Sequence, residues 1–272
     1  MSQKIDKALM YSYYLEDPKI QSIERKLDQI KVQYFYFDKS LEISTKSHEV
    51  LNGCLLEGAT KLIYERESYD FTQFDFFFLP PEKKLRIKIN TDSHKENKIC
   101  LVYSEIKKKR KVEFEFKHFD LNNFISRGEL SSSDRIATYR TVWTAIKNGY
   151  YMSGFTNIPN KALKQGVLTS VNLVENKSGE LEIYPHIHPG FPEVYIYCIS
   201  NEKVAITQYL INENGFSICR DLRDGDGLFF PGNYGHVNFA KPVYKELEFC
   251  MYMWIIPTLG LKDNIKPITL RI

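Results

Sequence analysis

The chain has 272 residues, with 37 Lys and Arg against 34 Asp and Glu, 43% apolar residues and 14% aromatic residues. This length and apolar content describe a globular protein that buries a large core, and they exclude a disordered chain or a fibre. The net charge of +3 supplies no strong field for nucleic acid or an anionic membrane surface, so neither is expected as a partner.

Short runs rich in Tyr, Phe, Ile and Val recur between turn residues along the chain, which is typical of strands. The runs are VQYFYF from residue 32, KLRIKI from 84, CLVYSEI from 100, VEFEFKHF from 112, EVYIYCI from 193, AITQYLI from 205 and EFCMYMWII from 248. Helical patterns are confined to residues 20–30 and 134–147. The sequence therefore predicts a mainly all-β protein with a few short helices.

A polar segment with Gly and Ser at residues 120–133 marks a domain junction. We expect an N-terminal domain at 1–125 and a C-terminal domain at 126–272, each the size of one β-barrel. A short internal repeat supports two similar halves, because Asp75 and Pro80 enclose an apolar run just as Asp226 and Pro231 do. The residues that follow the two prolines differ. His236 stands five residues after Pro231, whereas a leucine stands five residues after Pro80, so only the second copy could carry a polar site.

The apolar runs, the cysteines and one basic run bear on where the protein is located and on its redox state. The longest apolar run, residues 249–256, is far shorter than the roughly 18 residues of a membrane-spanning helix, and no signal-type stretch is seen near residue 1. The five cysteines are scattered and form no CxxC pair, which indicates reduced thiols rather than disulfides or a cysteine zinc site. The basic run at 107–111 is interpreted as a solvated strand end. We expect a cytoplasmic protein without membrane contact.

Three histidines and a glutamate in the C-terminal half form a candidate metal site. His186 and His188 are two residues apart, which in a strand places both on one face. The turn residues at 189–192 would fold Glu193 back toward them, and His236 follows the second copy of the repeat. Three imidazoles and one carboxylate suit Zn, with Mn, Fe, Co or Ni as alternatives.

The segment HxHxxxxE from His186 to Glu193 and the downstream segment G-x5-P-x4-H that ends in His236 form two motifs. They resemble the signature motifs of the cupin superfamily, with ligands matching His186, His188, Glu193 and His236. The context HIHPGFPEVYIYCI followed by LRDGDGLFFPGNYGHV is similar to the family of 5-keto-4-deoxyuronate isomerase and 5-deoxyglucuronate isomerase. The resemblance implies a bicupin of two jelly-roll barrels (double-stranded β-helices), the N-terminal one degenerate and the C-terminal one metal-binding. Two positions depart from the cupin pattern, since Ser200 stands where a glycine is common and Ala240 where an asparagine is common. Asn238 is a nearby candidate to replace that asparagine.

The resemblance also implies an activity. The implied enzyme is a metal-dependent aldose–ketose isomerase, an intramolecular oxidoreductase, that acts on a uronate through a metal-stabilised enediolate. Such an enzyme would serve carbohydrate metabolism, for example inositol catabolism. The expected partners are a small sugar-acid substrate and further copies of the chain, since the related enzymes are oligomeric. Candidates for the general base are Tyr195, Tyr197 and Glu246.

Two questions stay open at this level. The cation that would bind a substrate carboxylate has four candidates, which are Arg135, Arg140, Arg220 and Arg223. The activity has two alternatives, a cupin dioxygenase that uses Fe or Mn and a non-catalytic carbohydrate-binding cupin.

Overall fold

The computed structural model describes residues 9–12, 22–27, 30–90, 96–105, 114–120, 143–144, 151–157, 173–175, 178, 181–183, 186–187, 193–201, 206–212, 214–215, 217–230, 234–240, 247, 250–257 and 270–271. These residues form antiparallel β-sheets and contain no helix. The all-β prediction is therefore confirmed, whereas the short helices that it included are not found in the described residues. The chain divides into two compact units: the N-terminal unit is Leu15–Arg127 with Ala145–Gly149, and the C-terminal unit is Met1–Tyr14, Gly128–Thr144 and Tyr150–Ile272.

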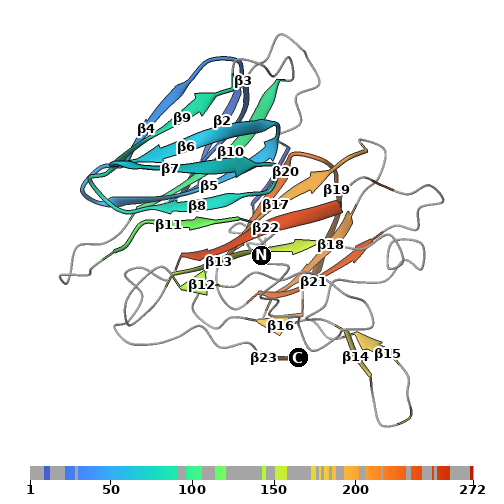
Figure 1. Ribbon diagram of the computed structural model, residues 1–272. Coiled ribbons are helices and arrows are strands. Elements are labelled where there is room, and N and C mark those ends of the chain that lie inside the picture. Colours follow the sequence, from blue (N-terminus) through green and yellow to red (C-terminus); the bar gives the residue numbers. More distant parts are fainter. Residues whose placement is uncertain are drawn as a thin grey trace. The chain divides into compact units, whose positions relative to one another are not determined.

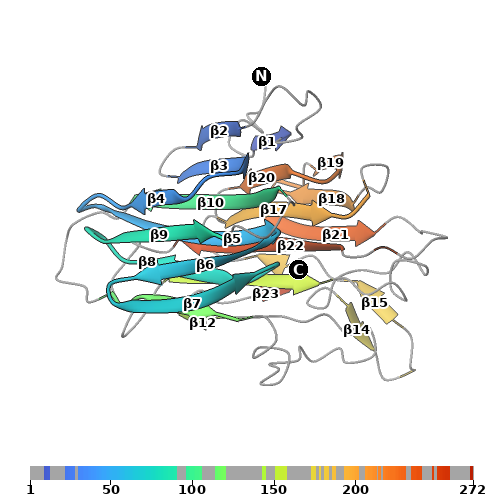
Figure 2. The same cartoon turned by 45° about the horizontal axis from the view of Figure 1, so that its top comes forward.

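The N-terminal unit contains two antiparallel sheets (Figure 1). The first is ordered β11 (Lys117–Phe119), β8 (Phe76–Leu79), β5 (Glu49–Glu57), β10 (Asn97–Glu105), β3 (Ile30–Phe37) and β2 (Ser22–Leu27). The second is ordered β4 (Leu41–Ser44), β9 (Lys84–Ile89), β6 (Ala59–Tyr64) and β7 (Glu67–Thr72). In both views the second sheet lies over the first (Figures 1 and 2).

The core of the N-terminal unit lies between these two sheets and is apolar. Alternation along the strands determines which residues belong to this core. In KLRIKI of β9 the leucine and the first isoleucine are buried, and the lysines and the arginine that alternate with them are exposed. The buried cluster consists of Phe37, Ile43, Leu51, Leu55, Leu62, Phe71, Phe77, Leu79, Leu85, Ile87, Ile99, Leu101 and Tyr103. Both sheets contribute to it, as expected for a two-layer barrel.

The helix predicted at residues 20–30 is wrong, because this region contains strand β2 and the start of β3. Their register runs from Ser22 opposite Phe35 to Leu27 opposite Ile30, which leaves a two-residue connection. The apolar spacing in this segment fits a helix as well as a strand, and pairing with β3 decides between them. The helix predicted at 134–147 lies outside the described residues except for Trp143–Thr144, which form a strand.

The C-terminal unit is also built from antiparallel sheets. The larger is ordered β1 (Leu9–Ser12), β20 (Asp226–Phe230), β17 (Glu193–Ile199), β22 (Cys250–Pro257), β13 (Tyr151–Asn157) and β12 (Trp143–Thr144). A second is ordered β19 (Ser217–Leu222), β18 (Ile206–Ile211), β21 (Gly235–Ala240), β16 (His186–Ile187) and β23 (Leu270–Arg271). A hairpin joins β14 (Leu173–Glu175) to β15 (Leu181–Ile183).

Strand β1 was not predicted, and it lies in an unexpected place. Although it is near the start of the chain, it pairs with β20 of the C-terminal unit, with Leu9 opposite Phe229 and Ser12 opposite Asp226. The residues 9–12 therefore belong structurally with the C-terminal unit, although the sequence-based division placed them in the N-terminal domain.

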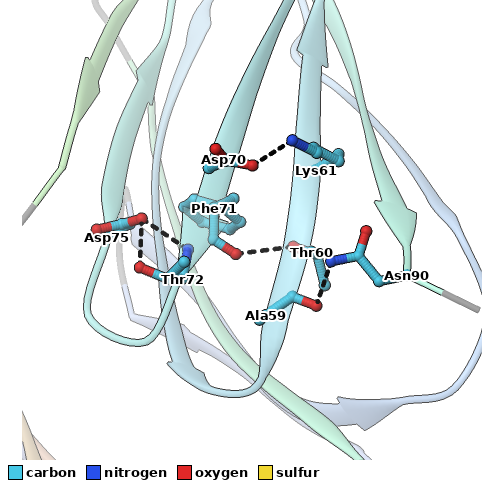
Figure 3. Close-up of polar contacts among 8 residues, drawn as sticks. All are labelled: Ala59, Thr60, Lys61, Asp70, Phe71, Thr72, Asp75 and Asn90. Carbon is cyan, nitrogen blue, oxygen red and sulfur yellow. Dashed lines mark hydrogen bonds and ion pairs between the residues drawn. The ribbon is translucent and has the colours of Figure 1, made fainter. Parts of the chain in front are cut away.

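The internal repeat has the same local structure in both units. Asp75 accepts hydrogen bonds from the backbone N–H and the hydroxyl of Thr72, at 2.6 and 2.9 Å (Figure 3). Asp226 accepts one from the backbone N–H of Arg223, also at 2.6 Å. In both copies the residue before the aspartate has a positive φ, 69° at Phe74 and 76° at Gly225. The aspartate thus closes the same tight turn before β8 and before β20.

Candidate metal centre

Strand β17 carries three of the side chains singled out in the sequence. It spans the predicted run EVYIYCI, and all seven of its residues are buried. Strand alternation places Glu193, Tyr195 and Tyr197 on one face. Contacts with β21 confirm this, because Glu193 and Tyr195 both reach His236 and Tyr197 reaches Asn238.

Glu193 and His236 form a buried pair. The Oε2 atom of Glu193 lies 3.2 Å from Nε2 of His236, and the two side chains are 3% and 1% exposed. On the other side of the imidazole, Nδ1 lies 3.2 Å from the carbonyl oxygen of Tyr234. A carbonyl oxygen can only accept, so Nδ1 carries the proton in the neutral ring and Nε2 presents its lone pair toward Glu193.

This pair fits a metal ion by its chemistry. Two atoms bound to one metal at about 2.1 Å stand roughly 3.0–3.4 Å apart, depending on the angle between them, and the measured separation lies in that range. Metal-bound histidines almost always donate their other N–H to a carbonyl or carboxylate, as Nδ1 does here.

The remaining two predicted ligands are only partly placed. The backbone of His186 lies in β16, directly opposite His236 of β21. His188 lies outside the described residues. Among the described residues no group of three or more His, Cys, Asp or Glu forms a metal cluster. The structure thus brings Glu193 and His236 together and puts His186 in register with His236, and the complete ligand set stays a prediction.

A hydrogen-bonded chain of buried polar groups lies beside this pair. The hydroxyl of Tyr197 donates to Oε1 of Gln208 at 2.5 Å, and Nδ2 of Asn238 donates to the same hydroxyl at 3.4 Å. The Gln208 amide is oriented because its Nε2 donates to the carbonyl of Val237 at 3.1 Å. Burial raises the pKa of Tyr197 well above its usual value, with Tyr252 adding to the effect, so the hydroxyl stays protonated.

Gln208 was not predicted from the sequence, and Asn238 was only a candidate to replace the asparagine that is common in cupins. A signal for Gln208 was available: in ITQYLI of β18 the inward positions alternate with half-buried ones, and this glutamine occupies an inward position between Ile206 and Leu210. A fully buried glutamine needs hydrogen-bond partners, which marks it as part of a network. Asn238 is 2% exposed and lies two residues after His236 on the same strand.

The candidate bases and arginines lie in different environments. The Tyr195 ring is buried and contacts the His236 ring edge-on at 5.8 Å between centroids. Glu246, Arg135 and Arg140 lie outside the described residues. Arg220 and Arg223 are exposed, and Nη1 of Arg220 donates to the carbonyl of Cys219 at 2.8 Å.

Comparisons with known proteins identify the fold. No family model matches the sequence, and no curated protein is significantly similar to it. Solved structures do match. An IolB-like protein from Salmonella typhimurium is 10% identical with a TM-score of 0.63, over 97% of this chain and 96% of that one. A variant of Bacillus subtilis oxalate decarboxylase is 11% identical with a TM-score of 0.61, over 97% and 79%. AerE from Microcystis aeruginosa is 10% identical with a TM-score of 0.55, over 86% and 90%.

These similarities show that the chain has the all-β cupin fold over nearly its whole length. Proteins of this fold include enzymes, among them the oxalate decarboxylase. In the part of the chain that the structure describes, no helix has the length and apolarity needed to cross a membrane.

Proposed function

We propose that the chain is a metal-dependent cupin enzyme that isomerises a sugar acid between its aldose and ketose forms. The observation that carries the proposal is the buried Glu193–His236 pair, whose 3.2 Å separation and oriented imidazole suit one shared metal ion. The choice of reaction rests on the resemblance of the two motifs to uronate isomerases, and the likeness to an IolB-like protein over nearly the full length of both chains supports it.

His186, His188, Glu193 and His236 would hold the ion. When bound, a divalent metal would polarise the substrate carbonyl as a Lewis acid and stabilise the negative charge that develops on the neighbouring oxygens. The identity of the metal stays a prediction, with Zn preferred and Mn, Fe, Co or Ni as alternatives.

The protein's own groups then have separate tasks. Isomerisation moves a proton between adjacent carbons, so one side chain must accept and return it. Tyr197 is poorly suited to this task, because its hydroxyl proton is directed at Gln208 and its pKa is raised. This leaves Tyr195 and Glu246 as the candidates for the base. Tyr197, Gln208 and Asn238 would instead hold β17, β18 and β21 at a fixed spacing around the pair.

The test is an isomerisation assay on protein loaded separately with each candidate metal. Proton NMR would follow the conversion of 5-deoxyglucuronate and of 5-keto-4-deoxyuronate, and an oxygen electrode would follow oxygen uptake on the same samples. We expect isomerisation by the wild type and by His48→Ala, whose side chain is exposed in the N-terminal unit, and none by His188→Ala. Oxygen uptake without isomerisation would replace this proposal with a dioxygenase, and a metal-loaded protein inactive in both assays would contradict an enzymatic role on these substrates.

A further inference from the structure

Three residues stand in one row across adjacent strands of the five-stranded sheet. His236 of β21 is opposite His186 of β16, and His186 is opposite Arg271 of β23. The order of this sheet ends with β21, β16 and β23, so β23 is the edge strand among the described residues. An arginine thus lies in register with two predicted metal-ligand positions, on the strand next to His186.

Register also determines the face of the sheet on which this row lies. Residues directly opposite each other in antiparallel strands share a face. The His236 side chain faces the barrel interior, where it contacts Glu193, Tyr195 and Phe230. The positions of His186 and Arg271 are therefore on the interior face. Neighbouring strands lie about 4.8 Å apart, so Arg271 is two strands, or roughly 10 Å, from His236 at the backbone.

Apart from this row, the described interior of the C-terminal unit contains no buried lysine or arginine. Its buried polar and charged side chains, within the ranges that the structure describes, are Glu193, Gln208, Asp226, His236 and Asn238. The buried lysine of the described residues, Lys98, belongs to the N-terminal unit. A sugar acid nevertheless needs a cation, since a carboxylate taken out of water is costly unless it is paired.

We propose that Arg271 binds the substrate carboxylate, while the reacting carbonyl end of the sugar lies at the metal-ligand positions on the next two strands, His186 of β16 and His236 of β21. This inference rests on the proposed function and adds the residue that selects an anionic sugar. A uronate carries its carboxylate at the opposite end of the carbon chain from the reacting carbonyl, which matches an arginine at the edge of the sheet and a metal site further in. Arginine suits the role because its planar fork binds both oxygens of a carboxylate.

The test compares a charged and a neutral sugar on metal-loaded protein by titration calorimetry. The probes are glucuronate and glucuronamide, which differ in the charge at one carbon. The variants are Arg271→Gln, Arg271→Lys and the control Arg220→Gln, which changes an exposed arginine on β19 at the opposite edge of the same sheet. Metal content and thermal stability are measured on each sample.

We expect the wild type and Arg220→Gln to prefer glucuronate. Arg271→Gln should weaken glucuronate binding by about 10- to 100-fold and leave glucuronamide within about twofold, since a hydrogen-bonded charge contributes about 1.5–3 kcal/mol. Arg271→Lys should fall between them, because an ammonium binds as a point charge. Metal content should not change.

Three results would overturn the inference: no preference for glucuronate in the wild type, an undiminished preference in Arg271→Gln, or loss of metal from that variant. The proposed isomerase activity fails separately. If the wild type prefers glucuronate through Arg271 but isomerises no uronate, the carboxylate site stands and the reaction is wrong.

Discussion

The two units share one strand plan but differ in what fills them. Aligning the two copies of the repeat matches β8 to β20, and the strand registers extend the match, since Leu51 is opposite Leu79 as Glu193 is opposite Phe230. Six positions on the interior face can be matched in this way. In the C-terminal unit they are His186, Glu193, Tyr197, Gln208, His236 and Asn238, and their N-terminal counterparts, in the same order, are Ile43, Leu51, Leu55, Leu62, Leu85 and Ile87. The polar side chains of the C-terminal unit are therefore not needed to form the fold, because the N-terminal unit has matching strands around an apolar cluster.

A compensating change in side-chain size accompanies this difference. In the N-terminal unit Gly53 is opposite Phe77. The matching positions of the C-terminal unit hold Tyr195 opposite Leu228. In the N-terminal unit the large ring comes from β8 and lies over the glycine, whereas in the C-terminal unit it comes from β17 and contacts His236. The smaller Leu228 of β20 thus accompanies the larger Tyr195 ring beside His236.

The largest effect is expected from replacing the pair by its N-terminal counterparts. The double variant Glu193→Leu with His236→Leu should lose metal binding and activity completely yet stay folded, because exchanging a buried polar pair for leucines is often neutral or stabilising. Metal analysis and thermal unfolding would check this. A double variant that does not fold would show that the metal site is structural, and His48→Ala serves as a control that should keep its metal.

Gly53→Ala should destabilise the N-terminal unit. A Cβ atom there would lie 2.2 Å from Cζ of Phe77, and this crowding should lower the free energy of unfolding by about 1–3 kcal/mol. Urea unfolding of the variant would measure the loss, and Gly53→Ala with Phe77→Leu should recover part of it. If the single variant is as stable as the wild type, the packing of the Phe77 ring against the glycine is misjudged.

Gln208→Leu would give the C-terminal unit the residue of its counterpart Leu62. The variant removes the acceptor of the Tyr197 hydroxyl, and leaving that group unsatisfied should cost about 1–3 kcal/mol. We also expect metal affinity to fall, because Gln208 bonds both Tyr197 of β17 and the Val237 carbonyl of β21 and so fixes the strands that carry Glu193 and His236. Chelator competition would measure the affinity. Adding Tyr197→Phe should restore stability, and unchanged stability in the single variant would contradict the network.

The smallest expected effect concerns His118 of the N-terminal unit. Its ring packs against Tyr69 at 4.9 Å, and burial lowers its pKa below 6.5 despite the opposing charges of Asp120 and Asp70. The unfolded chain therefore binds the proton more readily, so this group's stabilisation is complete above pH 6.5 and is lost as pH falls toward the lowered pKa. His118→Gln should narrow the difference in melting temperature between pH 7.5 and pH 5 by a few degrees at most. His48→Gln is the matched control, and an equal narrowing there would contradict the assignment.

The sequence was most informative where a local pattern decides the structure. KLRIKI matches β9, where alternation determines which side chains are buried, and EVYIYCI matches β17, a mostly apolar run that is buried on both faces. It failed where partners lie far apart along the chain. The pairing of β1 with β20 and the contact of Tyr197 with Asn238, 41 residues away, depend on register between distant strands, which no local pattern contains.

The candidate site divides in the same way. Glu193 and His236 could be predicted because each belongs to a motif of fixed spacing, and the structure brings them together. Gln208 belongs to no such motif, and the role that we propose for Arg271 follows from the register of β16 with β23. Both become visible once the strand order is known.

We propose that the Glu193–His236 pair of the C-terminal unit binds a metal ion, whereas its apolar N-terminal counterparts Leu51 and Leu85 cannot bind one. Elemental mass spectrometry of purified wild type and of His236→Ala tests it most directly. We expect close to one divalent metal ion per chain in the wild type and none in the variant, with both proteins folded. A wild type that stays free of metal after incubation with Zn, Mn, Fe, Co and Ni, or a variant that keeps its metal, would contradict it.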